Sequence, residues 1–188
     1  RDVLGSRGLG DVYKRQVLRQ TTARLPWLLI GMIGGIGNSM ILGNFDSTFA
    51  AHPEMALYIP LIGGTGGNVG TQSSAIIVQG LANSSLDAKN TFKQITKESV
   101  VALINATIIS LLVYTYNFIR FGATATVTYS VSISLFAVVM FASIFGTLVP
   151  MTLEKFKIDP AIATGPFIAI TNDIIGMMLY MGITVLLS

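Results

Sequence analysis

Long apolar segments, almost free of charged residues, constrain this chain more than any other feature of its sequence. They lie at about residues 25–42, 55–81, 100–118, 131–153 and 161–187. Each is near or above the roughly 20 residues that cross a bilayer as a helix. Charged residues make up only 11% of the 188-residue chain, whereas a soluble domain carries about 25%. The sequence therefore predicts an all-α membrane protein with five transmembrane helices.

The basic residues between these segments indicate how the helices are oriented, because positive residues concentrate in cytoplasmic loops. With the N-terminus inside, the outer side carries Arg120, and the inner side carries Arg19, Arg24, Lys89, Lys93, Lys97, Lys155 and Lys157. This asymmetry supports five spans in a cell membrane, with a cytoplasmic N-terminus and the C-terminus outside. We interpret the polar residues 86–99 as a cytoplasmic connector that lies along the membrane.

Residues 1–16 differ in kind from the rest of the chain. They are polar and Gly-rich, and they show no period. Residues 6–16 resemble the in-frame translation of a transposon-type sequencing adapter, and segments of this kind are set aside before fold reasoning. We therefore assign residues 1–16 to a non-native tail and residues 17–188 to one membrane domain, and we expect the natural gene to extend upstream.

The middle of the second segment is rich in glycine. Gly63, Gly64, Gly66, Gly67 and Gly70 fall within eight positions, and glycine is a poor helix residue. The pattern predicts a second helix broken by this run, which a membrane tolerates only where the backbone is buried in protein or lines a wet cavity. Packing glycines usually fall four apart. Because these are contiguous and interleaved with polar residues, we favour a pore or ion-site role over packing alone.

One charged side chain lies inside an apolar segment. It is Asp173, and a carboxylate at that depth costs about 2.5–3.5 kcal/mol on insertion scales. No Lys or Arg lies within the segments to pair with it. A protonated Asp bonded to a neighbouring helix is the structural alternative. A cation from solution is the more natural counter-charge, so we expect a cation site here.

The ligands available to such a cation are all oxygens. The chain has no cysteine and a single histidine, His52, which excludes thiolate and His-rich sites. The candidates are Asp173, the side chains of Asn68, Thr171 and Asn172, and carbonyls freed by the glycine run. Oxygen sites suit Mg²⁺, Ca²⁺ or Mn²⁺, and one carboxylate among carbonyls fits hydrated Mg²⁺ better than dehydrated Ca²⁺. This ranks the ions without settling the choice.

Two separated motifs resemble one known family. Residues 60–73, Pro-Leu-Ile-Gly-Gly-Thr-Gly-Gly-Asn-Val-Gly-Thr-Gln-Ser, resemble the second-span signature of the magnesium-transporter E family. That family shares its membrane domain with a group of animal magnesium solute carriers. Residues 158–161, followed by Pro166 and by residues 173–176 (Asp-Ile-Ile-Gly), resemble its fifth span. The likeness covers roughly residues 25–187 in order.

The resemblance implies a homodimer with the ion path on its two-fold axis, lined by the second and fifth spans. It implies Mg²⁺ as the main substrate, with other divalent ions such as Mn²⁺, Co²⁺ or Ca²⁺ also carried. Asp173 matches the family's ion-binding aspartate, and Gly64, Asn68 and Gly176 match positions that approach the hydrated ion. As further pore-lining candidates we name Thr65, Gly66, Gly67, Gln72, Pro166 and Asn172.

The chain also departs from the family pattern. Members usually carry a cytoplasmic N-domain and paired CBS modules before the first span, and truncation at the adapter would explain their absence here. Gly165 stands where a polar residue such as Asn is expected, which leaves one pore-mouth ligand in doubt.

The expected function is passive, gradient-driven Mg²⁺ transport through a dimeric pore. A carrier coupled to Na⁺ or H⁺ and a non-transporting membrane scaffold stay open as alternatives. With one loop histidine and no phosphate-binding GxxxxGK[ST] loop, we predict neither an enzyme nor ATP-driven transport. The expected partners are the lipid bilayer and a second copy of the chain, and no nucleic acid.

Overall fold

The computed structural model describes residues 2–86, 91–158 and 160–188, with side chains described at 13–86, 91–158, 165 and 167–188. Within these residues the chain is helical and holds no strand, so the all-α prediction is confirmed. The elements are α1 (Asp2–Gly43), α2 (Asp46–Ala51), the 3-10 helix η1 (Pro53–Tyr58), α3 (Ile59–Ala82), α4 (Thr91–Phe121), α5 (Thr126–Lys155) and α6 (Pro160–Leu187).

Several of these helices can cross a membrane. In the described part of the chain, four stretches are long and apolar enough: Tyr13–Gly43, Thr91–Phe121, Thr126–Lys155 and Phe167–Leu187. Helix α3 has 24 residues, or about 36 Å at 1.5 Å per residue, but its glycines and polar residues make it less apolar. The spanning length of the other four predicted segments is confirmed, and α3 as a fifth span stays a prediction.

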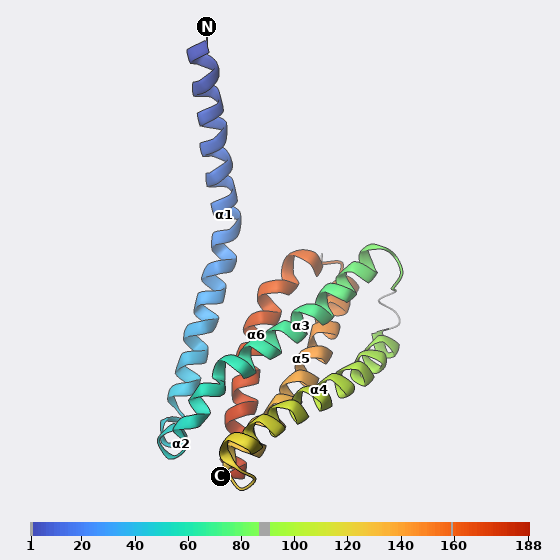
Figure 1. The fold of residues 1–188 in the computed structure, drawn as a ribbon. Helices are drawn as coiled ribbons and strands as arrows, with labels where there is room; N and C mark the ends of the chain where they lie inside the picture. The colour runs from blue at the N-terminus through green and yellow to red at the C-terminus, as the bar shows by residue number, and fades with distance from the viewer. Residues whose placement is uncertain (1, 87–90, 159) are drawn as a thin grey trace.

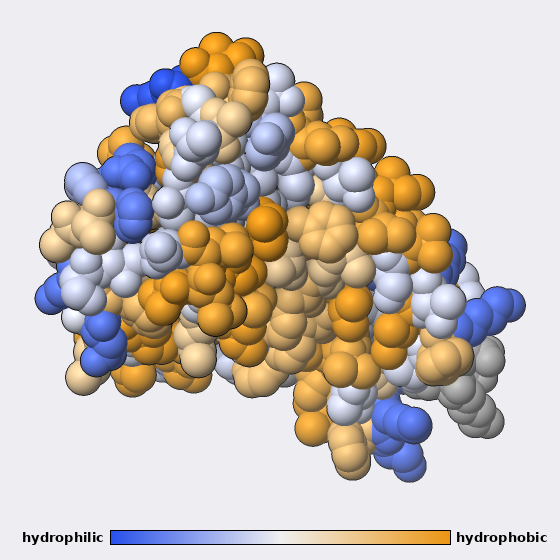
Figure 2. All heavy atoms as spheres, turned by 90° about the horizontal axis from the view of Figure 1, so that it is seen from below, coloured by the Kyte–Doolittle hydropathy of each residue, from blue (hydrophilic) through white to orange (hydrophobic). Residues whose placement is uncertain are grey.

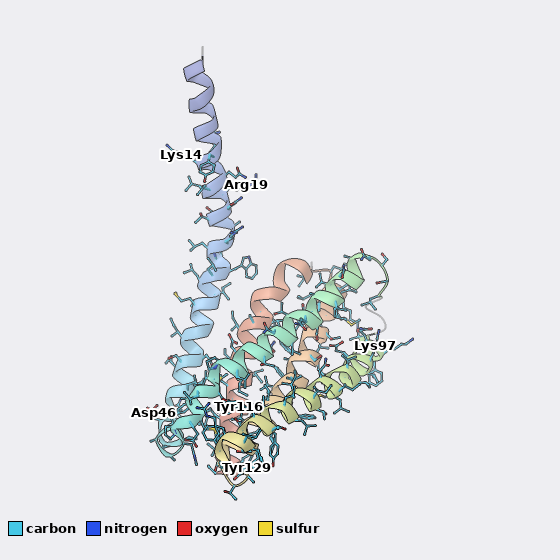
Figure 3. All side chains as sticks on the ribbon, in the orientation of Figure 1. Lys14, Arg19, Asp46, Lys97, Tyr116 and Tyr129 are labelled. Atoms are coloured by element: carbon cyan, nitrogen blue, oxygen red, sulfur yellow. The ribbon has the colours of Figure 1, made fainter. Side chains whose placement is uncertain are left out.

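The five long helices run alternately in opposite directions (Figure 1). The C-terminal ends of α3 and α5 lie towards the end of the molecule at which α1 starts, whereas α2 and the C-terminus lie at the opposite end. Figure 3 shows Lys14 and Arg19 on the first part of α1, Lys97 at the start of α4, and Asp46 at the far end. The orientation of the chain in the membrane stays a prediction.

Helix α5 is the centre of the bundle and packs against α3, α4 and α6. The core lies at the end that holds η1, where Val131, Leu135 and Val138 of α5 meet apolar side chains of η1, α3 and α6. Two hydrogen bonds fasten η1 there. The Tyr180 hydroxyl donates to the Met55 carbonyl at 2.8 Å, and the Tyr58 hydroxyl donates to Asn117 Oδ1 at 2.5 Å. These bonds fix where α3 begins.

Helix α1 stands apart from the other long helices (Figure 1). Its main contact is with α6, where Gly34 lies against the side chain of Ile170. Leu28 and Ile33 of α1, like Leu112 and Ile119 of α4, are exposed. Figure 2 shows apolar side chains over much of the face seen from below, with the most hydrophilic residues mainly along its edges. Lipid, rather than water, suits such a surface.

The prediction of a broken second helix is wrong. Helix α3 is continuous from Ile59 to Ala82. Its neighbours hold it, because a Cβ on Gly66 would lie 2.8 Å from Val138 of α5, and a Cβ on Gly70 would overlap Asn172 of α6. Close packing on two sides outweighs a propensity cost of about 1 kcal/mol per glycine. An unbroken helix frees no carbonyls, so the carbonyl ligands expected from the break are not supplied.

The prediction that residues 86–99 form a separate connector is also wrong for the residues that the structure describes. Residues 91–99 form the first turns of α4, which continues without interruption to Phe121. Residues 87–90 lie outside the described part of the chain. The third apolar segment therefore extends further at its N-terminal end than its hydrophobic residues indicate, and it brings Glu98 into the bundle.

Candidate ion-binding site

Asp173 lies on α6 where that helix meets the glycines of α3. A Cβ built on Gly63 would lie 3.7 Å from Asp173 Oδ1 and 3.4 Å from Met177 Cε. The contact is this close because Gly63 has no side chain of its own. Asp173 is nevertheless exposed in the single chain. The seam between α3 and α6 thus presents a carboxylate on an open surface, halfway along an apolar helix.

One surface of α3 is polar and unobstructed. Gly64, Asn68 and Thr71 are exposed and Gly67 is half-buried; these four residues, three or four apart on one side of the helix, are called the open face below. A Cβ added to Gly64 or Gly67 would meet no atom within 4 Å. The Thr71 hydroxyl donates to the Gly67 carbonyl at 2.7 Å, which satisfies the hydroxyl locally.

Three other predicted residues lie behind Asp173, in the interior of the bundle. Asn172 is 1% exposed, and its Nδ2 donates to the Gly66 carbonyl at 3.2 Å. Gly176 is buried, and a Cβ there would lie 3.6 Å from Val138 of α5. In the single chain, Asn172, Gly66 and Gly176 therefore form the seam that carries Asp173. Asn172 does not share the surface of Asp173, because successive helix residues point about 100° apart. Gly66 and Gly176 are covered by their neighbours in the bundle.

The remaining candidates separate in the same way. Gln72 lies on the other flank of α3, where it lines a pocket with residues of α4. Thr65 lies seven positions earlier, two helical turns away, and so shares the flank of Gln72. The side chain of Pro166 lies outside the described residues. Of the residues named from the sequence, Gly64, Gly67 and Asn68 therefore share the open face of α3, and Asp173 lies beside the same helix at Gly63.

The sequence did not predict that Glu98 lies among the helices of the bundle. Glu98 was placed in the polar connector, yet it is half-buried and accepts hydrogen bonds from Ser73 of α3 and Ser143 of α5. The available signal was the helical pattern of residues 86–99, which runs without a break into the third apolar segment. No local pattern could show that serines from two other helices meet there.

The described residues contain no group of three or more His, Cys, Asp or Glu side chains that could enclose a metal ion. One chain therefore supplies a single carboxylate at this surface, with amide and hydroxyl groups beside it. Such a set can contact an ion through the ion's own water molecules, and it does not replace those waters with protein ligands.

The same region matches a known family. The sequence profile of MgtE, described as a divalent cation transporter, matches residues 59–183, from the first residue of α3 into the last turns of α6. The chain belongs to the MgtE family. The matched region contains the open face, Asp173 and the seam that supports them, so the family assignment and the geometry concern the same part of the molecule.

Curated MgtE relatives match the chain outside this region as well. The magnesium transporter MgtE of Bacillus subtilis is 32% identical over 85% of this chain and 35% of its own length. The magnesium transporter MgtE of Thermus thermophilus is 32% identical over 88% of this chain and 36% of its own length. The magnesium transporter MgtE of Enterococcus faecalis is 29% identical over 88% of this chain and 36% of its own length. The chain thus spans about a third of the length of these relatives.

Proposed function

We propose that this chain forms the ion path of a divalent-cation transporter, with Mg²⁺ as its main substrate and Asp173 as the residue that holds the ion. The observation that carries the proposal is the lone carboxylate of an apolar helix, exposed beside an open face of glycines and polar residues. The family and the printed names of the relatives support the choice of Mg²⁺.

The open face fits a hydrated ion. Magnesium gives up its waters reluctantly and binds through one or two carboxylates while several waters stay in place. Gly64 and Gly67 leave the volume in front of the open face free, and an ion that keeps its water molecules needs such room. Asn68 and Thr71 offer an amide and a hydroxyl oxygen to those waters. The role of the glycines in this proposal is therefore to provide room, not carbonyls.

A second copy of the chain completes the site. Asp173 and Asn68, exposed at membrane depth in one chain, would be costly against lipid. Two chains related by a two-fold axis place the same surface of each against the other, so both open faces and both Asp173 carboxylates line one wet path. Two carboxylates balance the double charge of the ion, which one chain cannot do.

The remaining features of the proposal follow from the sequence. We place the protein in the cell membrane with five spans, of which α3 is the second in chain order, and with the N-terminus in the cytoplasm and the C-terminus outside. Transport is passive and follows the electrochemical gradient of the ion. Mn²⁺, Co²⁺ and Ca²⁺ are tested as competitors, because oxygen ligands do not by themselves exclude them.

The test is Mg²⁺ uptake into liposomes that hold the full chain, compared with Asp173→Asn. The variant keeps the shape of the side chain and removes its charge. We expect at least about a tenfold loss of flux, because contacts of a charged group contribute roughly 1.5–3 kcal/mol and 1.4 kcal/mol is tenfold. Glu154→Gln, the same chemical change at an exposed residue near the end of α5, serves as the matched control and retains wild-type flux.

Two outcomes would contradict the proposal. Wild-type flux in Asp173→Asn would show that Asp173 does not hold the transported ion. No uptake by the wild-type chain would contradict transport by this chain. The mass of the purified protein in detergent tests the dimer separately, and a monomer that transports would refute the shared path.

A further inference from the structure

Helices α3 and α4 leave a polar pocket between them. The pocket has a volume of about 240 Å³ and is closed on its third side by Val139 and Ser143 of α5. Its polar lining includes Gln72 of α3 with Gln94, Lys97 and Asn105 of α4. It lies on the flank of α3 that faces away from Asp173. Both helices pack against α5, so α5 holds them on either side of this gap.

Glu98 crosses the gap. Its Oε1 accepts one hydrogen bond from the Ser73 hydroxyl and another from the Ser143 hydroxyl, each at 2.6 Å. The two hydroxyl oxygens lie 3.1 Å apart, and both serines are buried. One carboxylate oxygen therefore joins α4 to α3 and α5 at a single point.

The contact at Ser73 lies closer to the C-terminal end of α3 than the part of the helix beside Asp173. Ser73 follows Gly63, the neighbour of Asp173, by ten residues, or about 15 Å of helix. Ser73 faces the bundle core, whereas the open face lies on the other side of the same helix. A rotation or shift of α3 at Ser73 would therefore move the open face relative to Asp173, since α3 is a continuous helix.

We propose that Glu98 is a positioning residue for ion transport. Through Ser73 and Ser143 it fixes α3 against α4 and α5, and so keeps the open face in line with Asp173. The polar pocket beside it gives α3 the space to move when this contact is lost. The inference rests on the proposed function, because it assigns a role in the use of the same ion site. Glu98 itself touches no transported ion in this proposal.

The first experiment compares Mg²⁺ flux for Glu98→Ala, Glu98→Gln and Gln94→Ala in liposomes, per folded protein and over a range of Mg²⁺ concentrations. Glu98→Ala removes the acceptor, and we expect the apparent KM for Mg²⁺ to rise about tenfold, because a misplacement of about 1 Å can cost far more than that. Glu98→Gln keeps a carbonyl oxygen that accepts both hydroxyls, and it restores most of the affinity. Gln94→Ala, on the same helix and the same pocket, behaves as wild type.

A second experiment reads the position of α3 without transport. The chain has no cysteine, so a cysteine pair at Ile76 and Val101, which line the pocket from α3 and α4, can be cross-linked specifically with thiol reagents of graded length. With Glu98 present we expect one reagent length to be strongly preferred. With Glu98→Ala we expect that preference to broaden or shift to longer reagents.

The outcomes separate this inference from the proposed function. No flux in the wild-type chain contradicts transport, and the cross-linking pattern then decides the role of Glu98 alone. Wild-type affinity and an unchanged cross-linking pattern in Glu98→Ala would overturn the inference while transport stands. A lowered maximal rate with unchanged KM would mean that Glu98 does not position the ion site, and it would also overturn the inference. Equal loss in Glu98→Gln and Glu98→Ala would mean that the charge itself is required, as in a second cation site, and would also overturn it.

Discussion

Four glycines in the middle of α3 fall into two pairs with opposite surroundings. Gly66 and Gly70 are buried against α5 and α6, and a Cβ on either would overlap or closely approach a neighbouring side chain. Gly64 and Gly67, interleaved with them, would meet nothing within 4 Å. The first group lets three helices approach closely, and the second leaves a surface free. One glycine-rich run thus builds both the seam that carries Asp173 and the space in front of it.

The difference shows what a glycine-rich run in a membrane helix can mean. A run of glycine lowers helix propensity, but propensity is a weak effect that tertiary contacts can override. Here the packed glycines keep the helix intact, so the open ones can remain without side chains and the helix does not unwind. Substitution of the two groups should therefore separate stability from transport.

The largest effect on stability is expected for Gly146→Ala. A Cβ on Gly146 of α5 would overlap the carbonyl oxygen of Gly70, and backbone atoms of a packed helix cannot turn aside as a side chain can. Overpacking of this kind costs roughly 1–3 kcal/mol, occasionally more. Thermal unfolding of the detergent-solubilised chain measures the loss. A midpoint equal to that of the wild type would show that α3 and α5 are not in contact here.

A smaller loss is expected for Gly70→Ala, because its Cβ would meet the side chain of Asn172. That clash can be relieved. In the background of Asn172→Ala the substitution should cost less than in the wild type, with a coupling free energy of about 0.5–3 kcal/mol. A double-mutant cycle in thermal or denaturant unfolding supplies the number. Additive effects would place Asn172 away from Gly70.

The smallest effect on stability is expected for Gly64→Ala and Gly67→Ala. Alanine favours a helix over glycine by about 1 kcal/mol, and nothing obstructs the added methyl groups in the single chain. The unfolding midpoint should stay or rise. Mg²⁺ flux should fall, because each methyl group narrows the proposed path in front of Asp173. Unfolding at lower temperature, as expected for Gly146→Ala, would erase the distinction between the two groups.

Much of the fold could be predicted from the sequence, because hydrophobic length is a property of consecutive residues. The four most apolar segments each lie within one long helix. The unpaired Asp173 could be singled out for the same reason, since its oddity is local. The broken second helix was wrongly predicted because the packing of Gly66 and Gly70 depends on α5 and α6, which lie far along the chain.

The surroundings of Asp173 were harder to predict than Asp173 itself. Sequence proximity placed Asn172 with its neighbour, but one step along a helix turns the side chain by about 100°, and Asn172 points into the bundle. Gln72 belongs to the glycine-rich motif and yet lines the flank of α3 opposite Asp173. Glu98 seemed to be a loop residue because its partners, Ser73 and Ser143, are 25 and 45 residues away.

The contacts of α6 also determine when this protein can acquire its site during synthesis. The helix that carries Asp173 leaves the ribosome after α1, α3, α4 and α5, and it is the main partner of α1, which leaves before them. The contact of Gly34 with Ile170 and the hydrogen bond from Asn172 to the Gly66 carbonyl can form only after α6 has been synthesised. Helices α3, α4 and α5 can assemble while translation continues, since N-terminal elements fold first. A chain that stops short of α6 would then be a bundle of α3, α4 and α5 with its open face formed, with α1 lacking its main partner and with no Asp173.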